Sequence, residues 1–405
     1  MTTLPFFTSL LILLIVARVF GEVCERFRQP SMLGEILAGV LLGPMLLSII
    51  QPTESIYVIS ELGIFLLVIL AGLEFDINEV IKSLRGRNIF IPIVAFALPL
   101  VSGFMLGRLF EFNTVASLFI GLCISVTALP ISIRILMDMN IINTDTAQKI
   151  ISAAIIQDIL ALTILGIIVN IPSEEFQISV LLQSIALTMG KLILFIALLS
   201  LAYVGSNKLA RRSNIVEEAF NRSLSLLKGK ESLLAVFFLF VLVFATIAEM
   251  LGFHFIIGAF FASMLINKKV IGQANHDTIE KSTSGLTMGF LSPIFFAYIG
   301  LKFNLMAIGN IWLLVAVLAV ASFSKILGGF LGGKIARLSK QKSLTLGIGL
   351  NGHGIMEIII ADIAYEANLI NAELFSIVVL MCLISVIITP ILLKKSYERI
   401  PEGEK

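Results

Sequence analysis

Residues 148–170 read QKIISAAIIQDILALTILGIIVN and carry an aspartate, Asp158, near the middle of an otherwise apolar stretch. The stretch is long enough to cross a lipid bilayer as a helix, which takes about 20 residues. A charged side chain at mid-membrane costs at least about 2.5–3.5 kcal/mol on insertion scales, so a chain keeps one there when it binds something. Asp158 and its neighbour Gln157 are therefore candidate ligands, and an aspartate paired with a buried base only to fix helix packing is the alternative.

The composition indicates a polytopic membrane protein. Hydrophobic residues make up 58% of the 405 positions and charged residues 14%, and the mean hydropathy is +1.02. No soluble domain of this length is so apolar. Apolar runs between polar breaks predict an all-α protein with about 13 transmembrane helices. Their expected limits are Leu4–Val23, Met32–Ile50, Ile56–Phe75, Ile89–Phe110, Val115–Met139, Thr146–Asn170, Ile178–Val204, Leu233–Met250, Phe253–Ile266, Leu286–Leu301, Met306–Ile335, Ser343–Ala367 and Ala372–Ser396.

Basic residues are concentrated in alternate loops between these helices. The loops after odd-numbered helices carry most of the lysines and arginines, whereas those after even-numbered helices have almost none apart from Lys302. The positive-inside rule then predicts a cell-membrane protein whose N-terminus lies outside and whose C-terminus is cytoplasmic. An odd number of helices agrees with that topology.

Two of the predicted helices are interrupted near mid-membrane. Residues 125–130 read SVTALP, in which the proline removes a backbone donor, and residues 347–354 read GIGLNGHG, in which four glycines should unwind a helix. The two helices are seven apart in order and run in opposite directions, which indicates an inverted repeat of helices 1–6 and 8–13. Such matched breaks favour a transport site, and a simple kink with close glycine packing is the alternative. The residues at the breaks are Pro130, Gly352 and Gly354, with Ser125 and Thr127 beside the proline.

Further polar residues complete the expected site. Lys325, midway along a predicted helix, can pair with Asp158 or cap the carbonyl end of a half-helix. Glu357 can neutralise two half-helix N-termini at the crossing, and we expect its role to be structural. The three cysteines and three histidines show no spacing typical of a disulfide framework or a protein-held metal site. His276 is expected in a solvated polar loop.

Five segments stand out in the chain: PSMLGEILAGVLLGP at 30–44, LAGLEF at 70–75, GAF at 258–260, PIFF at 293–296 and NGHGIME at 351–357. They resemble the signatures of the monovalent cation:proton antiporter-2 family. The resemblance spans almost the whole chain and implies the sodium/proton antiporter fold, with crossed broken helices, in a homodimer. It implies a dimerisation domain at 1–80 and 231–303, a core at 81–172 and 304–396, a linker helix and cytoplasmic loop at 173–230, and a cytoplasmic tail at 397–405.

The chain departs from the family pattern in three places. Gln157-Asp158 resembles the Kef-type potassium efflux members, whereas sodium exporters often have two acidic residues or Asn-Asp there. His353 stands where many relatives have an arginine. Its imidazole has two alternative roles, which are pH sensing and an ordinary hydrogen bond at a helix end. The chain has no GxGxxG-bearing βαβ unit like the one that Kef systems append, so such control would need a separate regulatory subunit.

These observations predict a secondary antiporter that exchanges potassium, or alternatively sodium, for protons. Asp158 would bind the metal cation and the proton in competition, Thr127, Ser125 and broken-helix carbonyls would supply oxygen ligands, and Gln157 would hold the geometry. A channel-like permease is the less favoured alternative, because it would need a continuous polar path and the sequence offers one compact site instead. An enzyme would need a nucleophile–base pair or metal ligands, and the sequence shows no such set. We expect no enzymatic activity, no cofactor and no nucleic-acid partner.

Overall fold

The computed structural model describes residues 4–27, 29–73, 86–128, 144–168, 232–266 and 271–401, with separate residues between 132 and 141 and between 186 and 201. Throughout this described part the chain forms helices and no strand. Eight of the helices described are long and apolar enough to cross a membrane. The predicted all-α, polytopic fold class is confirmed.

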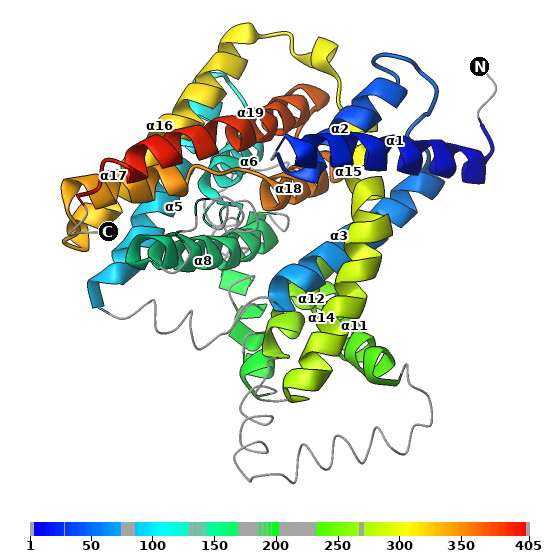
Figure 1. Ribbon diagram of the computed structural model, residues 1–405, viewed down its shortest axis with the longest axis horizontal. Helices are drawn as coiled ribbons and strands as arrows, with labels where there is room; N and C mark the ends of the chain where they lie inside the picture. The colour runs from blue at the N-terminus through cyan, green and yellow to red at the C-terminus, as the bar shows by residue number, and fades with distance from the viewer. Residues whose placement is uncertain are drawn as a thin grey trace. The chain divides into compact units, whose positions relative to one another are not determined.

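Figure 1 shows the helices in chain order. They are α1 (Phe6–Arg26), α2 (Ser31–Leu42), α3 (Glu54–Leu73), α5 (Phe90–Leu109), α6 (Thr114–Ser125), α8 (Asp145–Ile168), α11 (Ser232–Met250), α12 (Phe255–Leu265), α14 (Gln273–Leu286), α15 (Ser292–Lys302), α16 (Ile311–Ile335), α17 (Lys340–Gly349), α18 (Ile355–Glu366) and α19 (Ala372–Tyr397). Short 3-10 turns lie at Gly86–Ile89 (η1) and Leu305–Ala307 (η3), and a π-helical turn lies at Thr287–Leu291 (η2).

Polar caps fix where several of these helices begin. The side chain of Asn113 accepts a hydrogen bond from the Ala116 amide at the start of α6, and an asparagine caps α16 and α19 in the same way. Ser339 caps α17. These side chains satisfy amides that have no partner inside the helix, which is why Asn and Ser are favoured at this position.

Among the described residues, the two largest errors in the predicted boundaries have identifiable reasons. The second predicted span ends at Leu42, not Ile50, because Pro44 disfavours helical backbone at the residue before it. The tenth begins at Gln273, not Leu286, because α14, η2 and α15 form one helical run of 30 residues. Its first part is polar, so hydropathy alone placed the boundary at the apolar edge. The expected loop around His276 is therefore helix.

Some predictions fall outside the described residues. These are most of the seventh span, the second half of the fifth span with Pro130, and the bases of several loops. The rest of the thirteen predicted helices correspond to helices in the structure.

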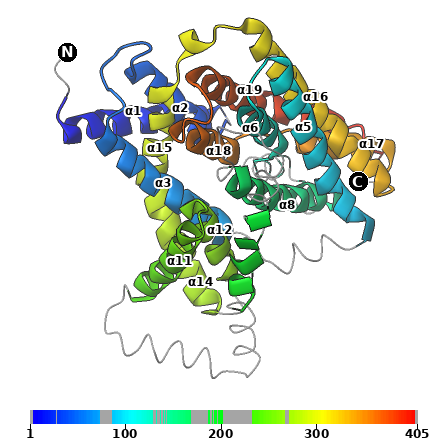
Figure 2. The ribbon, with the colours of Figure 1, turned by 180° about the vertical axis from the view of Figure 1, so that it is seen from behind.

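The chain packs as two compact units. The first comprises Met1–Pro52, Asn78–Ile168 and Phe296–Lys405, and the second comprises Thr53–Ile77 and Val169–Phe295. In the first unit α16 packs along α5 and α17, and α8 contacts α5, α6 and α17. In the second, α12 packs against α3 and α11, as Figure 2 shows from behind. The predicted division into dimerisation and core domains stays a prediction.

Lys302, the exception in the pattern of loop charges, is compensated inside the first unit. Its side chain is 6% exposed, and its ammonium contacts the carboxylate of Asp362 and lies 2.6 Å from Glu366 Oε1. Three aromatic rings surround it at 5.0–5.4 Å from their centroids, a distance at which cation–π attraction operates.

We expect Lys302→Met to destabilise the protein by about 3–5 kcal/mol, because it leaves the buried Asp362 carboxylate without its ammonium. Thermal unfolding of the detergent-solubilised chain measures the loss. The double variant Lys302→Met, Asp362→Asn removes both charges and should recover part of it. Equal unfolding temperatures for wild type and the single variant would contradict the prediction.

Candidate functional site

Two interrupted helices meet inside the first unit. Helix α6 ends at Ser125, and the chain continues in extended backbone at Val126. Helices α17 and α18 are separated by residues 350–354. The amide of Ala128 donates to the carbonyl of Gly352 across 2.7 Å. The two breaks therefore pair with each other, which satisfies backbone groups that lipid could not satisfy.

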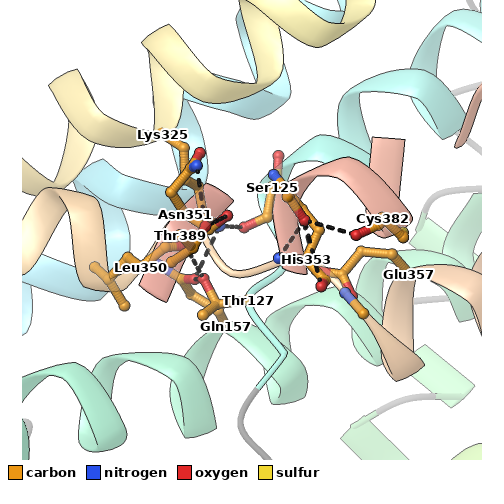
Figure 3. A network of polar contacts seen from close by, with 12 residues as sticks. Ser125, Thr127, Gln157, Lys325, Leu350, Asn351, His353, Glu357, Cys382 and Thr389 are labelled. Atoms are coloured by element: carbon orange, nitrogen blue, oxygen red, sulfur yellow. Dashed lines mark hydrogen bonds and ion pairs between the residues drawn. The ribbon is translucent and has the colours of Figure 1, made fainter. Parts of the chain in front are cut away.

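Thr127 and Gln157 form the centre of the polar cluster in Figure 3. Both side chains are fully buried. Thr127 Oγ1 lies 2.7 Å from Gln157 Oε1 and 2.7 Å from the Leu350 carbonyl. Because a hydroxyl has one proton, it donates to one of these acceptors at a time. Its lone pairs stay available to a cation.

Lys325 reaches this cluster from α16. Its buried ammonium donates to the Ser125 carbonyl, at the C-terminal end of α6, and to Gln157 Oε1 at 3.0 Å. A cation at a helix C-terminus is favoured by the helix dipole. Of the two partners that the sequence allowed for Lys325, the structure places it on the half-helix carbonyl. No ion pair with Asp158 occurs among the described residues.

Asp158 follows Gln157 on α8 and is 2% exposed. Its Oδ1 accepts no hydrogen bond from any described residue, and it is the sole buried carboxylate oxygen of the described chain of which this is true. Unpaired buried polar atoms are rare in native proteins, and a bound ion or water is a usual explanation. A carboxylate oxygen of this kind is a place for a proton or a metal cation.

His353 and Glu357 lie at the start of α18, both fully or almost fully buried. Glu357 Oε2 accepts from the Gly354 amide at 2.7 Å, and Oε1 lies 3.3 Å from His353 Nδ1. The His353 amide donates to Ser385 Oγ at 3.1 Å. An acidic group is stabilising at a helix N-terminus, so Glu357 caps a half-helix and holds the imidazole beside it.

A cavity of about 180 Å³ lies between the N-terminal parts of α5 and α8. Pro92 lines it, and the Pro92 carbonyl lies 3.4 Å from Gln157 Nε2, which donates to it. Pro92 therefore lines the cavity on one side and contacts Gln157 of the buried cluster on the other. Its lining residues are Asn88, Ile91, Pro92, Asp145, Gln148, Lys149, Ser152, Ala153 and Ile156.

The structure brings Ser125, Thr127, Gln157 and Lys325 into contact, with Asp158 next along α8. It also shows contacts that the sequence gave no sign of. The Leu350 and Pro92 carbonyls are backbone groups, which carry no signal in side-chain patterns. Thr389 accepts from Asn351 Nδ2 and donates to the Asn351 carbonyl, at 3.4 and 3.2 Å, from the distant helix α19.

The glycines of segment 347–354 divide into two kinds. A Cβ at Gly347 would lie 2.3 Å from the Ile326 carbonyl of α16, and one at Gly349 would lie 2.4 Å from Ile150 of α8. Close packing explains these two. At Gly352 the nearest atom, Ser132 Oγ, would be 3.6 Å away. Gly352 is at the break and not at a close contact between helices.

We therefore expect Gly347→Ala to destabilise the protein by about 1–3 kcal/mol, since the added methyl must displace backbone. Gly352→Ala is the matched control and should unfold at nearly the wild-type temperature. Thermal unfolding in detergent measures both. A larger loss for Gly352→Ala than for Gly347→Ala would contradict the packing argument.

The chain is similar over almost its whole length to two antiporters of Bacillus cereus. The chain is 27% identical over 394 residues to the "Probable Na(+)/H(+) antiporter GerT" of Bacillus cereus, covering 97% of this chain and 99% of that protein. It is 26% identical to the "Na(+)/H(+)-K(+) antiporter GerN" of Bacillus cereus, and this match covers 97% of this chain and 96% of that protein.

The solved structure of the sodium proton antiporter MjNhaP1 from Methanocaldococcus jannaschii at pH 8 matches with a TM-score of 0.66 and 15% identity, over 97% of this chain and 96% of that chain. This likeness confirms the predicted antiporter fold. The pattern of the family "Sodium/hydrogen exchanger, transmembrane" matches residues 10–395. The chain therefore belongs to the sodium/hydrogen exchanger family, whose members are membrane transporters and not enzymes.

Proposed function

We propose that the protein exchanges a monovalent metal cation for protons, with Asp158 as the group that binds either one. The observation that carries the proposal is the buried Asp158 oxygen without a hydrogen-bond donor among the described residues. Asp158 directly follows Gln157, which contacts Thr127 at the helix break. A proton and a cation compete for one carboxylate, so binding of one requires release of the other. Competition of this kind couples the two fluxes.

The surrounding residues would divide the remaining tasks. Thr127 Oγ1, together with the Leu350 backbone carbonyl at the other break, offers oxygen ligands of the type that hard cations prefer. Gln157 is fixed by Thr127, Lys325 and the Pro92 carbonyl, so it holds the site's shape without adding charge. Lys325 keeps the end of α6 in place.

Sodium is the first cation to test and potassium the second. The pair Gln157-Asp158 favoured potassium in the sequence analysis. The similar proteins are named as sodium/proton antiporters, one of them also with potassium, which supports sodium. A panel of sodium, potassium, lithium and rubidium, added in turn to vesicles with an internal pH probe, separates these alternatives.

The proposed setting is a cell membrane, with the N-terminus outside, the C-terminus in the cytoplasm and a homodimer formed by residues 1–80 and 231–303. In this topology α5 and α8 both begin at the cytoplasmic side. The cavity lined by Asp145 and Pro92 would then be the cytoplasmic route to Asp158.

Asp158→Asn should abolish exchange of every cation, because an amide cannot hold a proton or a cation in alternation. Proton flux in vesicles of purified, monodisperse protein is the measurement. Glu54→Gln, a similar replacement at the exposed start of α3, should leave the rate unchanged. Near wild-type flux in Asp158→Asn would remove the assignment.

Exchange should be electroneutral if Asp158 alone carries the exchanged charge. One carboxylate holds one proton or one monovalent cation, and Gln157 does not ionise. The test is the flux at several imposed membrane potentials. A steep voltage dependence would show that a second group, most simply Lys325, also releases protons during the cycle.

A further inference from the structure

A second group of polar side chains lies on α14, away from the Asp158 cluster. His276, Asp277 and Glu280 each offer one ligand atom, and these atoms all lie within 4.8 Å of one another. His276 Nδ1 is 3.5 Å from Glu280 Oε2 and 3.9 Å from Asp277 Oδ1. One turn of helix separates His276 from Glu280, which puts them on one face.

The histidine itself points to a ligand. His276 is 3% exposed, and its Nδ1 has no hydrogen-bond partner among the described residues. A buried polar atom without a partner is costly. A ring nitrogen that faces two carboxylates needs a proton or a metal ion between them, because carboxylate oxygens are acceptors only.

We propose that α14 carries a binding site for a divalent transition-metal ion, with His276 Nδ1, Asp277 and Glu280 as ligands. Bonds of about 2.0–2.2 Å in a tetrahedral arrangement put neighbouring ligand atoms roughly 3.4 Å apart, close to the spacing of the imidazole and Glu280. An imidazole with two carboxylates suits zinc, cobalt or nickel better than magnesium or calcium, which prefer oxygen ligands alone.

A neighbouring side chain supports the same site. Gln273 Nε2 donates to Asp277 Oδ1 at 2.6 Å, which orients that carboxylate. Hydrogen bonds of this kind to ligating groups are a usual part of metal sites. Glu280 and Asp277 are each 41% exposed at the side chain, whereas His276 is buried. The imidazole ligand is therefore buried in the protein, whereas the two carboxylate ligands are partly exposed to solvent.

The site also lies where an ion can reach it from water. The run from Gln273 to Lys302 has 30 residues, which as helix is about 45 Å long. The hydrocarbon core of a bilayer is about 30 Å thick. Because the polar residues are at the start of this run, His276 lies beyond the apolar part of the span.

The test is metal binding by the purified full chain, with any affinity tag removed. Cobalt(II) is the probe, since an imidazole–carboxylate site gives visible absorption bands, and zinc competes for it. We expect one cobalt ion per chain, displaced by zinc, in wild type. His276→Ala and Glu280→Gln should each bind at least about tenfold more weakly.

His254→Ala is the matched control. His254 also has an unpaired Nδ1, but no ion pair with a carboxylate occurs there among the described residues, so its replacement should leave cobalt affinity unchanged. Glu280→Gln changes an exposed position and keeps the test valid if His276→Ala unfolds. Absence of cobalt bands in wild type would overturn the proposal, as would wild-type affinity in Glu280→Gln.

Discussion

The structure of the site depends on one constraint, which is that every backbone group exposed by a broken helix must find a partner away from water. The Ala128 amide and the Gly352 carbonyl satisfy each other across the crossing. Lys325 satisfies the last carbonyl of α6, and Glu357 satisfies the amide of Gly354, the N-cap residue of α18. Each charge has the sign that opposes the helix dipole at its end. The breaks are therefore stable features of the fold.

This arrangement explains how the site can be polar and still carry a single free binding group. Gln157 is a neutral side chain that is fixed by three contacts, and Lys325 is engaged with a carbonyl and an amide oxygen. In the proposed exchange, the carboxylate of Asp158 binds either a proton or a cation. Either bound ion neutralises this carboxylate, so the exchange leaves no uncompensated charge on Asp158 in the membrane core.

The sequence predicted the fold class, most helices and the residues of the cluster. Charges and helix breaks inside apolar stretches cost free energy, so their presence in the sequence indicates a role at those positions. It left the partner of Lys325 open, since the sequence does not distinguish the carbonyl end of a half-helix from Asp158 as the partner of an ammonium. It could not predict the Leu350 and Pro92 carbonyls, which any residue would supply. It also missed the His276 group. The i, i+4 spacing of His276 and Glu280 becomes informative only when the segment is known to be helix, and its polarity had indicated a loop.

Burial alone does not distinguish a functional charge from a structural one. Asp362 is as buried as Asp158, but Lys302 neutralises it, and Glu357 is occupied by the Gly354 amide and His353. Among the carboxylates of the described chain, Asp158 is the one with a buried oxygen that accepts nothing. The assignment therefore rests on which charges have partners. This criterion separates binding from packing where hydropathy cannot, because both kinds of residue interrupt an apolar stretch in the same way.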